Sequence, residues 1–207
     1  DVLEGSSFYA QGGISAVLDA HDNFDQHVAD TLSTACGLAD EDAVNFMVKN
    51  APSAIDSLED AGVQFTKDKN DYHLTTEGGH SHRRVAHVAD KTGQSIQINL
   101  LSNVKKRNNI TLFEGCIAVD LLTQIDQCFG AYVLNKQTHE VELFVAHKTI
   151  LATGGASKVY RYTSNPDTST GDGIAMAKRA GCKIVNMEFA QFHPTCLYHP
   201  HAKSFLI

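Results

Sequence analysis

The hydrophobic period changes twice along this chain of 207 residues, and that alternation limits the folds open to it. Apolar residues at helical spacing predict helices over residues 25–35, 40–61 and 92–107. Across residues 110–155, short β-rich runs are separated by turn residues, which predicts strands. The segment 168–182, "TSTGDGIAMAKRAGC", returns to the helical period. Helices on both sides of a run of strands indicate an α/β or α+β fold.

Several details of these elements can be predicted. The helix over 40–61 is expected to bury one apolar face, made of Ala43, Phe46, Met47, Ala51, Ile55 and Leu58. Pro52 lies inside this helix and is expected to kink or split it. The run 148–155, "KTILATGG", predicts a buried strand that enters a turn with paired glycines. Asp172 stands just ahead of the last helix and is expected to cap it.

The composition argues against several classes of partner. A net charge of −7 disfavours nucleic acid or an anionic membrane surface as the main partner. No apolar run approaches the roughly 20 residues of a membrane helix, and no basic-then-apolar segment resembles an export signal. The five cysteines are scattered and never form C-x-x-C. That distribution predicts reduced, mostly buried thiols in a cytoplasmic protein.

The stretch 75–84, "TTEGGHSHRR", concentrates charged residues, histidines and a glycine pair. A metal site, a site for an anionic substrate and a solvated polar loop would each explain it. The chain has two H-x-H pairs, formed by His80 with His82 and by His199 with His201. No metal is expected at the first pair, because the guanidinium groups of Arg83 and Arg84 beside it would oppose a cation.

Glycine pairs recur at Gly12–Gly13, Gly78–Gly79 and Gly154–Gly155. Each pair fits an ordinary tight turn, or a backbone that closely approaches a ligand. The dinucleotide fingerprint G-x-G-x-x-G is absent. The chain begins at Asp1 without Met and stops in the apolar run "KSFLI", so we expect it to be the central part of a longer protein.

Four segments, taken together and in order, resemble the succinate dehydrogenase and fumarate reductase flavoprotein family. They are "SSFYAQGGISAV", "TTEGGHSHRRVAHVADKTG", "ILATGGASKVYRYTSNPDTSTGDGIAMAKRAG" and "MEFAQFHPT". The resemblance implies an FAD-binding domain of the glutathione-reductase type with an inserted capping domain. Residues 1–189 would be the later part of the FAD domain, without its N-terminal dinucleotide-binding strand and loop. Residues 190–207 would begin the capping domain.

The resemblance also implies which residues contact FAD. One expected group lies beside the flavin ring and consists of Ser6, Ser7, Phe8, Tyr9, Ala10, Gln11, Gly12 and Gly13. A second expected group consists of Ala152, Thr153, Gly154, Gly155 and Asp172. Backbone N–H groups of the first group, with the Gln11 amide, would donate hydrogen bonds to the flavin ring and favour its reduced form.

For the substrate site, the resemblance implies that His193 binds a substrate carboxylate. Family members that oxidise succinate usually have an apolar residue where this chain has Glu77, so Glu77 is expected to bind the ammonium group of L-aspartate. The implied reaction is oxidation of L-aspartate to iminoaspartate, with hydride transfer to FAD and reoxidation by O2 or fumarate. The product would pass to quinolinate synthase for NAD biosynthesis.

Two alternatives remain open from the sequence. One is a soluble fumarate reductase or succinate dehydrogenase-type flavoprotein of the same family, and the other is a metal-dependent hydrolase that uses the H-x-H pairs. Residues 1–207 by themselves are expected to be inactive, because the FAD pyrophosphate grip and the acid/base arginine of the family would lie outside them.

Ser6 leads to a prediction about how FAD is attached. In membrane-bound relatives a histidine at this position carries the covalent bond to FAD, and a serine cannot form that bond. FAD should therefore be released when the flavin-loaded protein is precipitated with acid. A yellow pellet after washing would contradict noncovalent binding.

Overall fold

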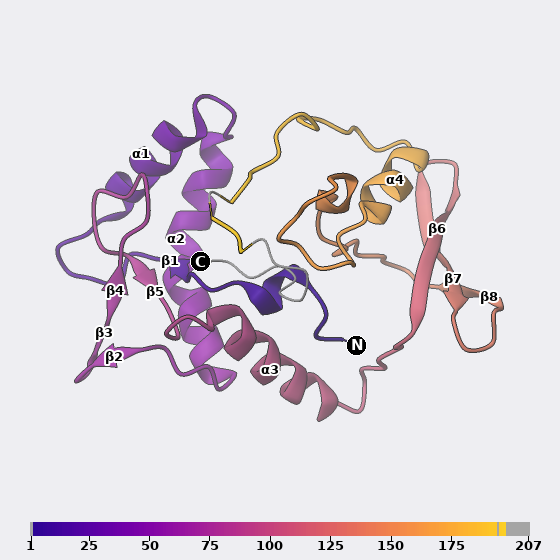
Figure 1. The fold of residues 1–207 in the computed structure, drawn as a ribbon, viewed down its shortest axis with the longest axis horizontal. Helices are drawn as coiled ribbons and strands as arrows, with labels where there is room; N and C mark the ends of the chain where they lie inside the picture. The colour runs from indigo at the N-terminus through magenta and orange to yellow at the C-terminus, as the bar shows by residue number, and fades with distance from the viewer. Residues whose placement is uncertain (1, 194, 198–207) are drawn as a thin grey trace. The chain divides into compact units, whose positions relative to one another are not determined.

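A computed structural model describes residues 2–193 and 195–197. These residues divide into two compact units, each of which is described by itself (Figure 1). One unit is Ser7–Ile110, and the other joins the segments 2–6 and 111–197. The boundary between the two units falls between Ser6 and Ser7, inside the short 3-10 helix η1, Ser6–Tyr9.

Three helices in Ser7–Ile110 confirm the helical periods of the sequence. They are α1 (Phe24–Ala35), α2 (Glu41–Asp60) and α3 (Thr92–Lys105). The side chains of Asn23 and Asp40 cap α1 and α2 by accepting hydrogen bonds from the N–H groups of Gln26 and Ala43. Helix α2 continues through Pro52, so the proline does not split it.

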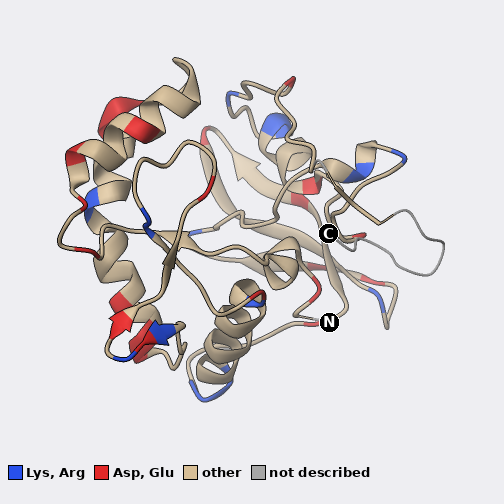
Figure 2. Cartoon of the chain, turned by 60° about the vertical axis from the view of Figure 1, so that its left-hand side comes forward, with Lys and Arg blue, Asp and Glu red and all other residues tan. Residues whose placement is uncertain are grey.

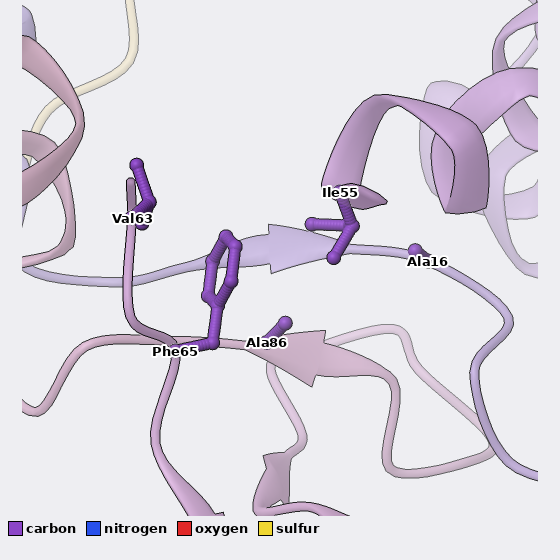
Figure 3. Packing of buried hydrophobic residues seen from close by; sticks show 5 residues of the cluster. All are labelled: Ala16, Ile55, Val63, Phe65 and Ala86. Carbon is purple, nitrogen blue, oxygen red and sulfur yellow. The ribbon is translucent and has the colours of Figure 1, made fainter. Parts of the chain in front are cut away.

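The α1–α2 pair packs through Val28, Val44 and Val48. Further along α2, Ile55 enters a second cluster with Ala16, Val63, Phe65 and Ala86 (Figure 3). The buried face of α2 therefore follows Val44, Val48 and Ile55, which recur at helical spacing. The predicted face was wrong at Ala43, which is exposed, and at Phe46 and Met47, which are 73% and 53% exposed.

Short strands complete this unit. They are β1 (Ile14–Ser15), β2 (Lys67–Asp68), β3 (Asp71–Tyr72), β4 (Leu74–Thr75) and β5 (Val85–Ala86). An antiparallel sheet has the order β1-β5-β4, and β2 and β3 form a separate antiparallel pair. Ala86 in the central strand is opposite Ile14 on one side and Leu74 on the other. This sheet joins the start of the unit to the charged stretch 75–84.

Helix α2 is rich in acidic residues, which are red in Figure 2. One of them, Glu59, binds the β2–β3 pair. Glu59 accepts hydrogen bonds from Lys67 Nζ at 2.8 Å and from the Tyr72 hydroxyl at 2.9 Å. Burial and the Glu59 carboxylate raise the pKa of Tyr72 to about 12. The hydroxyl therefore stays protonated and keeps donating over the whole range in which proteins are handled.

The other unit contains a sheet of three antiparallel strands, β6 (Cys116–Gln124), β7 (Gln127–Asn135) and β8 (Val141–Val145), in that order. It also contains a short 3-10 helix, η2 (Ser157–Val159), and helix α4 (Asp172–Arg179). Arg179 Nε donates to Asp120 Oδ2 at 2.9 Å and so joins α4 to β6.

Two predictions from the sequence were wrong: the buried strand over residues 148–155 in this unit, and the burial of most cysteines. The run 148–155 forms no strand, because no segment among the described residues pairs with it, and Ile150 is 88% exposed. None of the five cysteines is fully buried, and Cys36, Cys182 and Cys196 are exposed. Within the described residues, no helix combines the length and apolar character needed to cross a membrane.

Arg84, immediately before β5, is the most deeply buried charged residue described, with 0% of its side chain exposed. Its Nε and Nη2 donate to both carboxylate oxygens of Asp22 at 2.9 and 2.8 Å, and its Nη1 donates to Asp30 Oδ2 at 2.7 Å. The N–H and hydroxyl of Ser81 donate to the same oxygen of Asp30 at 2.8 and 2.7 Å. Helix α1 is thereby held to the loop that precedes β5.

The two carboxyl groups stay ionised in this network. Burial alone would raise the pKa of both, but hydrogen bonds from Arg84 to Asp22, and from Ser81, Gln26 and Arg84 to Asp30, outweigh it and lower both pKa values. Each therefore stabilises the fold above the unfolded pKa of about 3.9. That contribution is lost as the pH falls through the lower folded values.

Replacing Arg84 with Met should lower the free energy of unfolding by about 3–5 kcal/mol, because two buried carboxylates would lose their cation. Urea denaturation at neutral pH measures the loss. The matched control is Arg83→Met, since Arg83 is exposed and its guanidinium makes one long hydrogen bond, to Leu74 O at 3.4 Å. The control should change stability by less than about 0.5 kcal/mol, and equal losses in the two variants would contradict the role given to the buried network.

Candidate functional site

A pocket of about 550 Å³ opens within the unit Ser7–Ile110. Its walls come from the segment that leads into β1, the turn after β4, β5, and the first turns of α3. The lining residues are Ser7, Ala10, Gly12, Gly13, Ile14, Ser15, Glu77, Gly78, His80, Val85, Thr92, Gly93, Ile96 and Gln97. The volume lies within the range of small-molecule sites, about 300–1,000 Å³.

The first wall is held against the start of α3 by close backbone approach. Gly93 N–H donates to Ala10 O at 3.0 Å, and the Thr92 hydroxyl donates to Gly12 O. A Cβ on Gly93 would overlap the carbonyl oxygen of Ser7. Only glycine lets this segment lie so near the helix.

The same segment offers backbone donors to a ligand. The N–H groups of Gln11 and Gly12 have no acceptor among the described residues, and both residues are exposed. Gly13 lies so close to Ala86 that a Cβ would overlap the Ala86 carbonyl oxygen. Free amide groups beside glycines that leave room for a ligand fit the pyrimidine oxygens and N5 of a flavin ring, all of which can accept hydrogen bonds.

The Glu77 side chain lies against this segment, at Gly12. One of its carboxylate oxygens, Oε1, lies 3.0 Å from the point that a Cβ on Gly12 would occupy. Glu77 begins a turn that is closed by a bond from His80 N to Glu77 O at 3.1 Å, with Gly79 at φ +90°. A positive φ at the third residue is the requirement of a type II turn, which favours glycine there.

The turn ends at His80, whose ring contacts a second histidine, His27. The His80 ring meets the His27 ring edge to face, with centroids 6.1 Å apart. His27 is only 4% exposed, and its Nδ1 has no hydrogen-bond partner among the described residues. Burial, aided by the nearby charge of Arg84 and opposed by Asp22 and Asp30, lowers the pKa of His27. The buried ring is therefore neutral at physiological pH.

Part of the first predicted FAD-contacting group gathers at this pocket. Ser7, Ala10, Gly12 and Gly13 line it together with Glu77. Phe8, Tyr9 and Gln11 belong to the same segment but are not among the lining residues. Ser6 lies in the other unit, where its hydroxyl donates to Asn165 Oδ1 at 2.8 Å and lies 3.1 Å from Ser169 Oγ.

The second predicted group gathers at the start of α4. Gly171 N–H donates to Gly155 O at 3.1 Å, and Thr153 packs so tightly on Gly173 that a Cβ there would overlap the threonine side chain. Ala152 and Gly154 belong to the same segment, 152–155. Asp172 is the first residue of α4, and the cap position is Gly171, so the predicted capping role of Asp172 was wrong. Its contact with FAD stays a prediction.

His193 is exposed in that unit, with Nδ1 2.7 Å from Thr195 O. Because Glu77 belongs to the other unit, a joint site of the two residues stays a prediction. The residues that the structure describes contain no group of three His, Cys, Asp or Glu side chains arranged to hold a metal ion. His199 and His201 lie outside the described residues.

Sequence reasoning missed Thr92, Gly93 and His80 as parts of the site, although all three lie within the second quoted motif. The signal was the T-G pair at the start of a predicted helix, where a threonine hydroxyl and a missing side chain allow close backbone approach. Sequence reasoning also treated the arginines of 75–84 alike. Arg84 is committed to the buried network with Asp22 and Asp30, and is not free to bind a substrate.

Comparison with known proteins gives the family of the chain. The family model described as FAD binding domain matches residues 1–207. The chain belongs to this FAD-binding family, and FAD, the predicted cofactor, is confirmed as the cofactor that defines it.

Curated relatives narrow the relationship. The chain is 53% identical to the L-aspartate oxidase of Pseudomonas aeruginosa over 100% of its own length and 41% of that protein. It is 54% identical to L-aspartate oxidase 1 of Ralstonia nicotianae over 99% of its length and 40% of that protein. The chain thus spans about two fifths of the length of the curated relatives it matches.

Solved structures give the same picture. Mycobacterium smegmatis Sdh1 in complex with UQ1 matches 99% of this chain with a TM-score of 0.90 at 31% identity, over 37% of that chain. An E. coli quinol fumarate reductase matches 83% of this chain with a TM-score of 0.80 at 30% identity, over 29% of that chain. The predicted relationship to succinate dehydrogenase and fumarate reductase flavoproteins is confirmed.

Gly93→Ala should destabilise the protein by about 1–3 kcal/mol, because the new methyl group meets the Ser7 carbonyl. Helix propensity alone would favour alanine by about 1 kcal/mol, so a loss has the opposite sign to a purely local effect. Urea denaturation gives the loss, and flavin titration should show weakened binding. Gly78→Ala is the control for stability, since a Cβ there meets nothing within 4 Å; equal losses of stability in the two variants would contradict the close packing.

Proposed function

We propose that the chain forms part of a flavin-dependent enzyme that oxidises L-aspartate to iminoaspartate. The observation that carries the proposal is the Glu77 carboxylate, which lies directly over Gly12 in the pocket beside the free N–H groups of the segment before β1. Relatives that are 53% and 54% identical and named L-aspartate oxidase support it. A carboxylate at this place can bind an ammonium group, which an amino acid has and a plain dicarboxylate lacks.

Within this proposal, FAD would be held noncovalently and would supply a hydride acceptor for the substrate Cα, while a base takes the proton lost from the amino group. The N–H groups of Gln11 and Gly12 hold the flavin ring, and Gly13 and Gly93 keep the backbone close enough to line it. Residues 1–189 belong to an FAD domain of the glutathione-reductase type, and residues 190–207 begin a capping domain that excludes water from the reacting atoms. The turn 152–155 and Asp172 contact another part of FAD.

Two residues orient the substrate. Glu77 binds the ammonium group of L-aspartate by a charge-assisted hydrogen bond. His193 donates to a substrate carboxylate, a group that L-aspartate shares with succinate and fumarate. O2 or fumarate would take up the two electrons removed from the substrate. The imine product hydrolyses readily, so we propose that the enzyme hands it to quinolinate synthase for NAD biosynthesis. We place this enzyme in the cytoplasm.

Fumarate reduction is the second candidate function, favoured by the fumarate reductase among the similar solved structures. The two functions differ at the α-substituent of the substrate. An acidic side chain over the pocket favours the amino-acid substrate, because it would repel rather than bind a ligand that carries only negative charge.

Glu77→Gln should lower kcat/KM for L-aspartate by about 10- to 150-fold, which corresponds to about 1.5–3 kcal/mol for a hydrogen bond to a charged group. Fumarate reduction should change much less, because fumarate has no ammonium group for Glu77 to bind. Steady-state kinetics of the full-length protein with both substrates measures the contrast. Equal losses would show that Glu77 serves the fold or the chemistry in general.

His193→Ala is the matched comparison for that experiment. Both substrates present a carboxylate, so both should bind more weakly in this variant. Unchanged affinity for succinate and fumarate would remove His193 from the site, and would leave the test of Glu77 intact.

A further inference from the structure

The turn that carries Glu77 is closed from both sides by His80. His80 N–H donates to Glu77 O at 3.1 Å, and Glu77 N–H donates back to the ring nitrogen Nδ1 of His80 at 3.3 Å. The first bond is the main-chain bond that often closes a turn of this kind. The second is made by a side chain, and it fastens the residue from which the carboxylate projects.

These partners fix the tautomer of His80. A backbone N–H can only donate, so Nδ1 must be the unprotonated nitrogen of a neutral ring. The proton then resides on Nε2, which lies 3.4 Å from the hydroxyl oxygen of Ser15 and can donate to it. Ser15 belongs to β1, so the ring spans from the sheet to the turn.

The other anchors of this loop lie on either side of the turn. Before it, Thr75 pairs with Val85 in the sheet. After it, Ser81 donates to Asp30, and Gly79 lies against the side chain of Thr34. Among the described residues, the Glu77 N–H has no other hydrogen-bond acceptor, so the His80 ring alone holds this end of the turn.

We propose that His80 is a positioning residue that sets substrate selectivity. By accepting the Glu77 N–H at Nδ1, it holds the backbone from which the Glu77 carboxylate is presented over Gly12. The substrate class it selects is an α-amino dicarboxylate rather than a plain dicarboxylate. This inference rests on the proposed function, in which Glu77 binds an ammonium group.

Two amide substitutions separate the two ring nitrogens. In His80→Asn the carboxamide oxygen can occupy the place of Nδ1 and accept the Glu77 N–H. In His80→Gln the longer side chain reaches toward the place of Nε2 and Ser15, and leaves the Glu77 N–H without its acceptor. The variants are alike in charge and polarity, so a difference between them reports on the nitrogen that each one replaces.

In the full-length, flavin-loaded protein, His80→Gln should raise KM for L-aspartate about 3- to 10-fold, the range expected for one neutral hydrogen bond. The KM for fumarate and the flavin absorbance spectrum should stay close to wild type. His80→Asn should recover most of the loss. Equal KM values for aspartate in both variants, or equal effects of His80→Gln on aspartate and fumarate, would overturn the positioning role.

A double substitution separates this inference from the function on which it rests. With Glu77→Gln already present, His80→Gln should add no further rise in the KM for aspartate, because the group it positions has been replaced. An additional rise of the same size would show that His80 acts independently of Glu77. If Glu77→Gln alone affects aspartate and fumarate equally, the proposed function fails, whatever His80 does.

Discussion

A buried arginine organises the unit that carries the pocket. Arg84 binds Asp22 before α1 and Asp30 inside it, while its own main chain leads directly into the central strand β5. A charge so completely withdrawn from water is tolerated only with its full set of partners. Those partners fix the loop before β5 against α1, and Ser81 shares the same carboxylate. The turn that presents Glu77 is thus tied to a helix far away in sequence.

Glycines, which have no side chain, shape the other side of the pocket. Gly93 allows the segment before β1 to lie against α3, and Gly13 allows the same segment to approach β5. The result is a wall of backbone with free N–H groups at Gln11 and Gly12, facing a single carboxylate at Glu77. The charged residues of 75–84 therefore have two different roles: Arg84 stabilises the fold, and Glu77 faces the pocket.

The helices were predictable because their periods and capping residues are local properties, as at Asn23 and Asp40. The buried face of α2 was misjudged, since period alone does not say which of two adjacent apolar stripes meets α1. The run 148–155 failed as a strand because a strand requires a neighbour, and β propensity says nothing about whether one is present. Cysteine burial failed for a similar reason, because hydrophobicity gives only an average tendency.

By itself the sequence determined the family and the cofactor, because four segments, taken together and in order, resemble one flavoprotein family. It could not say which of the charged residues between Thr75 and Arg84 would be buried. That choice was made by the tertiary structure, where α1 brings Asp22 and Asp30 to Arg84 and leaves Glu77 at the pocket. Burial and ion pairing depend on partners distant in sequence, and only the folded chain brings those partners together.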